Sequence, residues 1–331
     1  MKKTIFPFYV IAAIAMLFVA PDHAVTAPTS APTFANLEVN VGFFYSSLAP
    51  HGEWIELNSG MYGWRPMRMH AGWRPYLYGR WVWTDFGWYW VSNEQFGWAT
   101  YHYGRWTRLA RRGWVWVPDT QWAPAWVSWR HSDRYTGWAP LPPESRLTVG
   151  VSLGDWVDSY YDVGPTAYSF VETRHLGAPR LATVLISPRE NVNIIRETRN
   201  VTNVTVVNNM VVNNGPGYEE VSRRVDRPIR RLRLERVDAA PAEGGRNVRV
   251  EGDTVKFATP RMTAQSAGKP RKVAQRIERA EIDRGWQNAG AAADLQPLRE
   301  KMKAEAKVPA SLPPKPAPLE RTRATAGTEA R

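Results

Sequence analysis

One sequence pattern recurs three times in the first half of the chain. It consists of a glycine, then Glu or Arg, then Trp, and after a short gap the pair Gly-Trp. The three copies are HGEWIELNSGMYGWRP, YGRWVWTDFGWYWV and YGRWTRLARRGWVWV. Their opening glycines, Gly52, Gly79 and Gly104, are separated by 27 and 25 residues. Because a period of this length marks a repeated supersecondary unit, the chain is predicted to build one small element several times.

Each repeat is typical of a β-hairpin. RWVW and WYWV contain the aromatic and β-branched residues that suit a pleated surface, and TDFG between them supplies a turn in which Gly87 is free to take a positive φ. Residues two apart in a strand share a face. Cross-strand aromatic pairs are therefore expected on one face of the hairpin, which is formed by Trp81, Trp83, Trp88 and Trp90. The opposite face is expected to be apolar as well, and it is formed by Val82, Tyr89 and Val91.

The hairpin pattern, the many prolines and the absence of helical periodicity predict an all-β fold class. We expect repeated aromatic β-hairpins, as a small barrel, a sandwich or stacked hairpins, in a Trp-rich module over residues 42–145. A β-rich basic segment follows over 146–260, and a disordered or partly helical Pro/Ala-rich tail over 261–331. The tail is expected to be dispensable for folding from about Met262, and RKVAQRIERAEIDRGW within it is predicted to be a short helix.

Tryptophan is concentrated in the module, which holds 15 of the 17 residues, and cysteine is absent. Indole burial replaces disulfides as a source of stability, so each Trp is a candidate core residue. Fifteen indoles nevertheless exceed the number that a core of this size is expected to hide, and exposed aromatic rings bind ligands. Arginine stacks well on indole. The candidate glycan platforms are Trp81, Trp83, Trp88, Trp90, Trp106, Trp114 and Trp116, with Arg80 and Arg105.

The N-terminus, MKKTIFPFYVIAAIAMLFVAPDHAVTA, predicts export. Two lysines precede an uncharged stretch, Ile5 to Ala20, and small residues follow, which is the layout of a secretory signal peptide over residues 1–27. Residues 28–41 are interpreted as a linker, and the mature chain is expected to begin between Val25 and Pro28. The apolar stretch is shorter than the ~20 residues of a spanning helix. We therefore expect a periplasmic or extracellular protein that is not transmembrane after cleavage.

Residues 42–145 also carry the segments PAWVSWR and GWAPLPP beside the GRW and GWxWV motifs. With these motifs the segment resembles a tryptophan-rich domain of unknown function found in exported bacterial proteins, a group loosely similar to proteins with WxxGxW-type repeats. NVTNVTVVNNMVVNNGP also resembles what often follows that domain. The resemblance implies export and a cell-envelope setting. It implies no catalytic residues, because the activity of that family is unassigned.

The sequence gives little support for catalysis. No two of the six histidines have the spacing of metal ligands on a helix, and P-loop, Gly-x-Ser-x-Gly and dinucleotide motifs are absent. We expect no cofactor and no metal. An unrecognised hydrolase that uses His102 with Glu94 or Asp119 stays an alternative, as does a carboxylate pair for glycoside hydrolysis. The acidic candidates are Asp85, Glu94, Asp119 and Asp133, of which Asp85 and Asp119 are also typical turn residues.

The second half of the chain carries most of the positive charge. A strand pair is predicted for NVNIIRETRNVTNVTVVNNMVVNNG, because this segment alternates Val/Ile with Asn/Thr. The pair either closes the domain as a hairpin or pairs with the edge strand of a partner. In the second case the contacts would be made by Asn203, Asn208, Asn209, Asn213 and Asn214. RRVDRPIRRLRLER is a basic run that indicates an anionic partner or, alternatively, a solvated strand. Its candidate polyanion-binding residues are Arg223, Arg224, Arg227, Arg230, Arg231 and Arg233.

The function we expect is that of a non-enzymatic exported cell-envelope protein whose Trp-rich module binds envelope or extracellular polysaccharide by aromatic stacking. Nucleic acid is not an expected partner of an exported chain. The alternative outside enzymology is a structural or assembly protein that uses aromatic patches for protein–protein contacts.

Overall fold

The structure is a computed structural model that describes residues 41–58, 61–145, 152–207, 210–237, 248–258, 268–278 and 280–306. The predicted signal peptide and nearly all of the linker, the two asparagines at 208 and 209, and residues 307–331 lie outside the described residues. Within the described part of the chain, no helix is long and apolar enough to span a membrane.

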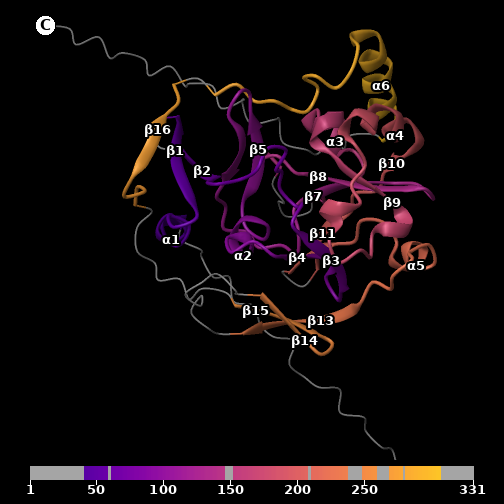
Figure 1. Cartoon of the computed structure of the whole chain (residues 1–331), viewed down its shortest axis with the longest axis horizontal. Helices are drawn as coiled ribbons and strands as arrows, with labels where there is room; N and C mark the ends of the chain where they lie inside the picture. The colour runs from indigo at the N-terminus through magenta and orange to yellow at the C-terminus, as the bar shows by residue number, and fades with distance from the viewer. Residues whose placement is uncertain are drawn as a thin grey trace, which may run out of the picture. The chain divides into compact units, whose positions relative to one another are not determined.

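Most of the regular structure is β-strand, in three sheets (Figure 1), so the predicted all-β class is confirmed. The first sheet has the order β16-β1-β2-β6-β5. It contains two antiparallel hairpins, β1–β2 and β5–β6, which are joined where β2 pairs with β6. The bounds are β1 (Gly52–Asn58), β2 (Met61–Pro66), β5 (Arg105–Leu109), β6 (Gly113–Val117) and β16 (Val273–Arg276).

The second sheet has seven strands in the order β11-β12-β4-β3-β13-β15-β14. The aromatic hairpin β3–β4 lies in its middle, and later parts of the chain extend it on both sides. The predicted Asn/Val strand pair is confirmed in its later part as β11–β12, which joins β4 within the chain. Its first residues, Asn191–Glu197, form a helix instead of a strand. The bounds are β3 (Gly79–Thr84), β4 (Gly87–Ser92), β11 (Val204–Val207), β12 (Met210–Asn213), β13 (Arg231–Val237), β14 (Val248–Glu251) and β15 (Thr254–Ala258).

The third sheet has the order β10-β7-β8-β9 and, unlike the other two, is antiparallel at every pair. Its strands are β7 (Val127–His131), β8 (Tyr135–Pro140), β9 (Ser169–Glu172) and β10 (Arg199–Asn200). The helices are short apart from the last. They are α1 (Val41–Ser47), α2 (Gly97–Thr100), α3 (Val157–Tyr161), α4 (Asn191–Glu197), α5 (Tyr218–Ser222) and α6 (Ala292–Ala304), with 3-10 turns η1 (Pro165–Ala167), η2 (Thr173–His175), η3 (Leu181–Thr183) and η4 (Pro188–Glu190).

Tryptophan pairs face each other across every hairpin of the module, as the alternation predicts. Such cross-strand aromatic pairs stabilise a sheet through side-chain packing. The fourth hairpin, β7–β8, also carries such a pair, although its sequence is only an incomplete copy of the repeated pattern. The pairs are Trp54–Trp64, Trp81–Trp90, Trp83–Trp88, Trp106–Trp116 and Trp129–Trp138.

The glycine that opens each repeat makes room for a tryptophan of the partner strand. A Cβ at Gly79 would lie 2.6 Å from the Trp90 ring and 2.4 Å from the Val91 carbonyl oxygen. At Gly52 and Gly104 the Trp64 and Trp116 rings would lie 2.4 and 2.8 Å away. These separations are far below an ordinary van der Waals contact, so the Gly-x-Trp frame records a packing requirement of the hairpin.

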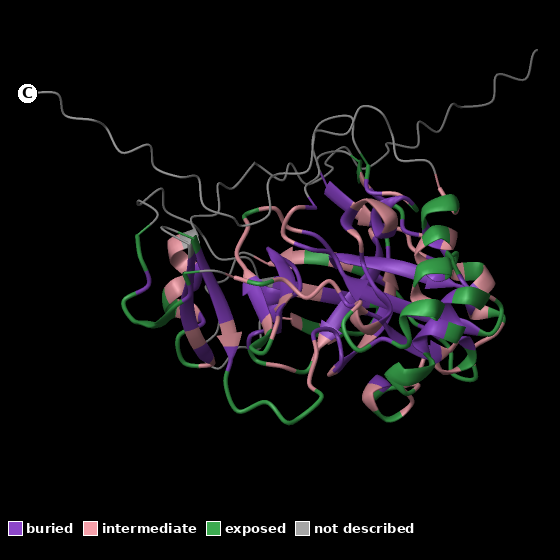
Figure 2. Ribbon diagram, turned by 90° about the horizontal axis from the view of Figure 1, so that it is seen from above, coloured by how far each residue is buried: buried purple, intermediate pink, exposed green. Residues whose placement is uncertain are grey.

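Twelve of the 17 tryptophans are buried, and the other five are partly buried. Figure 2 shows buried residues concentrated in the strands and exposed ones on helices and loops. The expectation that the module has too few residues to hide its indoles is wrong, because it counted only the module. The main cluster also contains Val171, Leu176, Leu181, Val221 and Ile229 from the second half of the chain.

The predicted division at residue 145 therefore separates parts that pack as one. β9 pairs with β8, β10 with β7, β12 with β4, and β13 with β3. On the other face of β3–β4, Val82, Tyr89 and Val91 pack with Leu232 and Val255 of β13 and β15. Both faces of the hairpin are covered, as predicted, but by strands from the basic segment.

Part of the tail that was expected to be dispensable, between residues 268 and 306, packs against the rest of the described fold. β16 pairs in parallel with β1, and the predicted helix over 271–286 is wrong because its start is this strand. The helix begins later, at Ala292, and α6 packs against α3 and α4 (Figure 1). Leu298 and Met302 of α6 are buried in the second hydrophobic cluster. Apolar positions of the tail thus complete a core that local composition does not reveal.

Candidate functional site

Five of the seven predicted tryptophan platforms are not at the surface. Their side chains are 0–2% exposed, so the prediction that they offer a ring face to a sugar is wrong. Three of them also donate the indole N–H to a backbone carbonyl: Trp88 to Pro216, Trp106 to Thr100 and Trp116 to Tyr103, at 2.7–2.8 Å. The five buried residues are Trp81, Trp88, Trp90, Trp106 and Trp116.

The other two candidates, Trp83 and Trp114, are partly exposed. Trp83 packs edge-to-face on Trp88, with ring centroids 5.3 Å apart, and lies at the same distance from the Tyr218 ring. Trp114 is paired across β5–β6 with Arg108. The two residues come from different sheets, so the described residues give no continuous aromatic platform built from the repeats.

The predicted stacking of arginine on indole occurs inside the protein. The Arg105 guanidinium lies 3.2 Å from the centroid of Trp126, and Arg105 is 2% exposed. Its Nε donates to the Ser145 carbonyl at 3.1 Å. Arg105 therefore holds the core together and is not available to a glycan, whereas Arg80 is partly exposed at a pocket described below.

The basic run 223–236 contains strand β13, in agreement with the solvated-strand interpretation. Most of its arginines have partners: Arg224 pairs with Asp133, Arg231 with Glu219, and Arg233 with Asp253, while Arg230 donates to the Gly252 carbonyl. The side chains of Arg223 and Arg227 have no hydrogen bond or ion pair among the described residues. Arg227 of the run lines a cavity.

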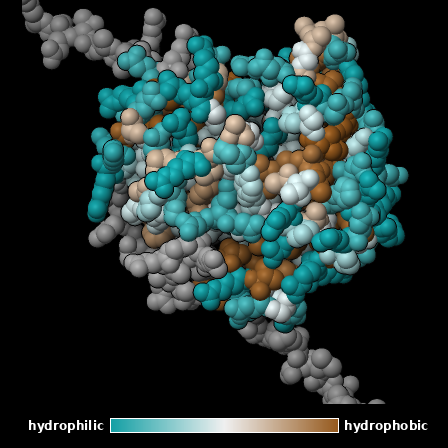
Figure 3. All heavy atoms as spheres, in the orientation of Figure 1, coloured by the Kyte–Doolittle hydropathy of each residue, from teal (hydrophilic) through white to brown (hydrophobic). Residues whose placement is uncertain are grey.

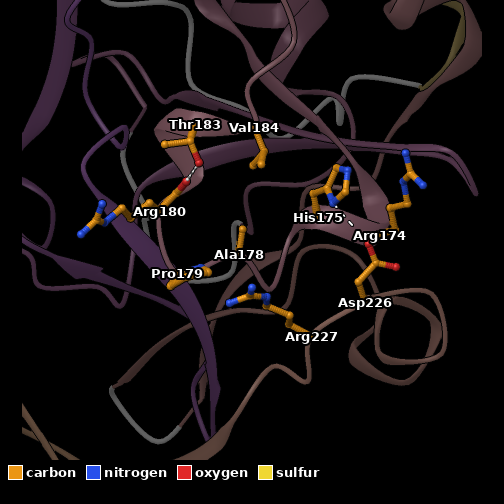
Figure 4. Close-up of a pocket in the computed structure, with 9 residues that line it drawn as sticks. All are labelled: Arg174, His175, Ala178, Pro179, Arg180, Thr183, Val184, Asp226 and Arg227. Carbon is orange, nitrogen blue, oxygen red and sulfur yellow. Dashed lines mark hydrogen bonds and ion pairs between the residues drawn. The ribbon is translucent and has the colours of Figure 1, made fainter.

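The lining of that cavity is rich in positive charge, with three arginines and one histidine against one aspartate. Its volume is about 730 Å³, and it lies between two loops, residues 174–184 and residues 226–227. Figure 4 shows its lining: Arg174, His175, Ala178, Pro179, Arg180, Thr183, Val184, Asp226 and Arg227. We call it the arginine cleft.

The two loops of the arginine cleft are held together through their backbones. The Asp226 N–H donates to the Arg174 carbonyl at 2.8 Å. Gly177 lies so close to the other loop that an added Cβ would be 2.1 Å from the Arg227 carbonyl oxygen. Glycine is therefore required at this close approach, and the side chains of both loops are brought to one opening.

The charges of the cleft are only partly balanced. Arg174 pairs with Glu172 at 2.6 Å, and His175 Nδ1 lies 3.4 Å from Asp226 Oδ2. The Arg180 and Arg227 guanidinium groups have no ion pair or hydrogen bond with any described residue. Two unpaired guanidinium groups beside a small apolar floor of Ala178, Pro179 and Val184 suit a carboxylate or phosphate group.

The sequence analysis identified only Arg227 of this cleft. Arg174, His175 and Arg180 lie in VETRHLGAPR, about fifty residues earlier in the chain, and carry no motif. The pairing that brings the two loops together runs through backbone atoms. No spacing rule within either segment signals it.

His102 and Glu94, the candidate hydrolase pair, line the same pocket but bond to different partners. His102 packs against both Tyr89 and Trp122, with centroids 4.6 and 6.0 Å away, and its Nδ1 lies 3.0 Å from the Ala123 carbonyl oxygen. Burial lowers the pKa of His102 to about 4. Among the described residues, no hydrogen bond or ion pair joins His102 to Glu94 or Asp119.

Glu94 is held by two aromatic donors. Its carboxyl oxygens accept from the Trp73 indole at 2.7 Å and from the Tyr101 hydroxyl. Burial raises the pKa of Glu94 to about 7. The remaining acidic candidates have structural roles: Asp85 accepts from Leu234 N, Asp119 accepts from Thr120 N in the predicted turn, and Asp133 pairs with Arg224. The described residues contain no group of three His, Cys, Asp or Glu side chains suited to a metal ion.

The raised pKa of Glu94 predicts a pH dependence of stability. The folded state binds the Glu94 proton more tightly than the unfolded state, where the pKa is near 4.5. The contribution of the protonated Glu94 carboxyl to the free energy of unfolding is thus complete below pH 4.5 and is lost as the pH rises through about 7. The free energy of unfolding of the natural chain, minus that of Glu94→Gln, should fall over this interval in urea titrations. A difference that stays constant with pH would contradict the assignment.

Comparison with known proteins adds one finding. No curated protein and no solved structure matches this chain significantly. A family model does match residues 45–145, which is the whole run of four aromatic hairpins described above, and it is described as a family of unknown function, DUF6600. The match begins and ends within a few residues of the predicted module, so the similarity to this family of unknown function lies in residues 45–145.

Proposed function

We propose that this protein is an exported, non-enzymatic component of the cell envelope that binds an anionic glycan through the arginine cleft. The glycan is recognised by its carboxylate or phosphate groups. The buried tryptophans hold the frame on which the cleft is built, and they do not contact the ligand.

The observation that carries this proposal is the pair Arg180 and Arg227 in one cavity, without partners among the described residues. Isolated surface arginines are common, and most arginines of the basic run have acidic neighbours. Two unpaired guanidinium groups at one opening leave up to ten N–H donors for planar oxyanions. A cleft open to solvent also attracts polyanions over several ångströms at low salt.

Support for the cell-envelope setting comes from the sequence. The charged-then-apolar N-terminus is typical of a secretory signal peptide. In the envelope of a bacterium, phosphorylated and uronic-acid polysaccharides are the abundant polyanions, whereas nucleic acid is not expected there. The absence of cysteine fits a fold that depends on indole packing in place of disulfides.

The test is calorimetric titration of the full chain with tetragalacturonic acid, a carboxylate-bearing probe. Arg180→Ala/Arg227→Ala should weaken binding by about ten-fold or more, which corresponds to about 1.4 kcal/mol. The affinity of the natural chain should also fall when the salt concentration rises to about 0.15 M.

The matched control is Arg189→Ala/Arg199→Ala, which removes the same charge from two exposed arginines outside the cleft. It should keep the affinity within about two-fold, since screened distant charges contribute little. Equal losses in both double variants would show attraction by net charge alone. Undiminished binding by the Arg180→Ala/Arg227→Ala protein would exclude the cleft.

A second candidate function, as an assembly protein, is favoured by strand β11. Val206 and Val207 of this strand are 48% and 51% exposed, and β11 is an edge of the seven-stranded sheet. Exposed apolar edge strands pair readily with other chains. Figure 3 shows that hydrophobic residues form several patches on one face of the molecule. Concentration-dependent association that Val206→Lys abolishes would support this function.

A further inference from the structure

A second cavity, of about 530 Å³, lies at the far end of the β3–β4 hairpin and shares no residue with the arginine cleft. We call it the Glu94 pocket. It opens between the loop that follows β4, helix α2 and strand β14. Its volume falls within the range typical of small-molecule sites, about 300–1,000 Å³.

One side of the Glu94 pocket is polar and held in place by hydrogen bonds. The Ser92 hydroxyl accepts from the Glu94 N–H at 3.0 Å, and the Asn93 N–H donates to the Tyr78 carbonyl at 2.9 Å. The Glu94 carboxyl is fixed by Trp73 and Tyr101. A carboxylate has about four acceptor positions, so each Glu94 oxygen keeps capacity for a ligand hydroxyl.

His102, whose Nδ1 lies at the Ala123 carbonyl oxygen, also lines the pocket. The remaining polar side chains of the lining are Arg80, Asn93 and Gln95. Their side chains make no hydrogen bond to any other described residue. They offer five guanidinium donors and two carboxamides, each of which both donates and accepts. The pocket thus combines fixed acceptors with free donors.

The opposite side of the Glu94 pocket is apolar. Val248 and Val250 of β14 face the hairpin residue Val91, and Trp98 of α2 closes one end. Trp98 is itself fixed by edge-to-face packing with Phe43 at 5.9 Å. An apolar wall opposite a row of hydrogen-bonding groups accommodates a ring that has a C–H face and polar edges.

We propose that the Glu94 pocket binds a neutral saccharide of one or two rings. Sugar hydroxyls both donate and accept, which matches the mixture of carboxyl, carboxamide and guanidinium groups, while the C–H face of the ring packs on the valines and Trp98. The lining mixes the Arg80 guanidinium with the Glu94 carboxyl, so it does not select a ligand of one charge. The inference concerns a site separate from the arginine cleft and does not rest on the function proposed for it.

The test uses three neutral disaccharides as probes: cellobiose, maltose and N,N′-diacetylchitobiose. Binding to the full chain is followed by tryptophan fluorescence and by amide chemical shifts. At least one probe should bind with a Kd of about 1 mM or tighter. Asn93→Ala/Gln95→Ala should weaken that binding by about ten-fold or more. Both residues are exposed, so this variant should keep the melting temperature of the natural chain.

Two controls make the outcome specific. Asn203→Ala/Gln296→Ala removes exposed amides elsewhere and should leave the disaccharide affinity unchanged. Arg180→Ala/Arg227→Ala should also leave it unchanged, so failure of the arginine cleft and failure of the Glu94 pocket are distinguishable. The proposal is overturned if none of the three disaccharides binds at about 10 mM. It is equally overturned if binding survives in the Asn93→Ala/Gln95→Ala protein.

Discussion

Trp88→Ala and Trp116→Ala are each expected to lower the free energy of unfolding by about 3–5 kcal/mol. Both side chains are 0% exposed, and each has a tryptophan opposite on the partner strand. Each substitution leaves a large cavity and also orphans a carbonyl, that of Pro216 or Tyr103, which accepts the indole N–H in the natural chain. Urea unfolding followed by near-ultraviolet circular dichroism measures the loss.

Trp114→Ala is the matched control, because Trp114 is in the same hairpin as Trp116 but is partly exposed. Its cost should be clearly smaller. If Trp88→Ala and Trp116→Ala cost no more than Trp114→Ala, these indoles are not core residues. The sequence predicts that substitution of at least one of Trp83, Trp90, Trp106 and Trp116 abolishes glycan binding without loss of fold. Of these four, only Trp83 is partly exposed, and the other three are buried.

A chain truncated at Pro260 should lose cooperative unfolding at the natural midpoint. It lacks β16, which pairs with β1, and α6, whose Leu298 and Met302 fill the second cluster. It also lacks Glu305, which accepts two hydrogen bonds, at 2.6 and 2.7 Å, from Arg130, a side chain that is 0% exposed. Removing a partner of a buried charge typically costs about 3–5 kcal/mol.

Arg130 keeps one partner in the truncated chain, the Asp158 carboxylate at 2.8 Å. A chain that ends at Ala306 retains every contact of the described residues and is the appropriate control. It should unfold at the natural urea midpoint. Should the Pro260 truncate also unfold at that midpoint, the tail would be dispensable, as the sequence composition alone suggests.

The parts of the fold that were predictable are those encoded within a few residues. Alternation along RWVW and WYWV predicts the two faces of β3–β4, and the register of Trp81 with Trp90 confirms them. Gly87 has φ +81°, the positive value expected of the turn. The Asn/Val pattern likewise predicts the hairpin β11–β12. Each of these features depends on the period of a strand or on the chemistry of a turn.

The parts that were not predictable depend on contacts between distant segments. Nothing in the module shows that Val171, Val221 and Ile229 cover its indoles, and so the number of exposed tryptophans was overestimated. Asn213 illustrates the same limit. Its side chain accepts from the Trp129 indole at 2.9 Å and donates to the Ala125 carbonyl at 3.1 Å, so a residue considered for partner binding serves the core.

The candidate sites likewise combine features that the sequence predicts with features that depend on contacts between distant segments. The sequence identifies a basic run, but its composition does not distinguish Arg227 from neighbours such as Arg231 and Arg233, which pair with acidic residues. Only the fold brings Arg227 to Arg180. Glu94 was considered as a catalytic carboxylate with His102, whereas its bonds to Trp73 and Tyr101 are visible only once three separate segments pack together.

The central claim is that ligand binding belongs to the arginine cleft while the repeated tryptophans form the core. Nuclear magnetic resonance tests it most directly, because arginine Nε–H and indole Nε1–H signals are resolved in one spectrum. On titration with tetragalacturonic acid, the Nε–H signals of Arg180 and Arg227 should shift, and the indole signals of Trp81, Trp88, Trp90, Trp106 and Trp116 should stay in place. Shifts confined to those indoles, with the two arginine signals unchanged, would contradict the account.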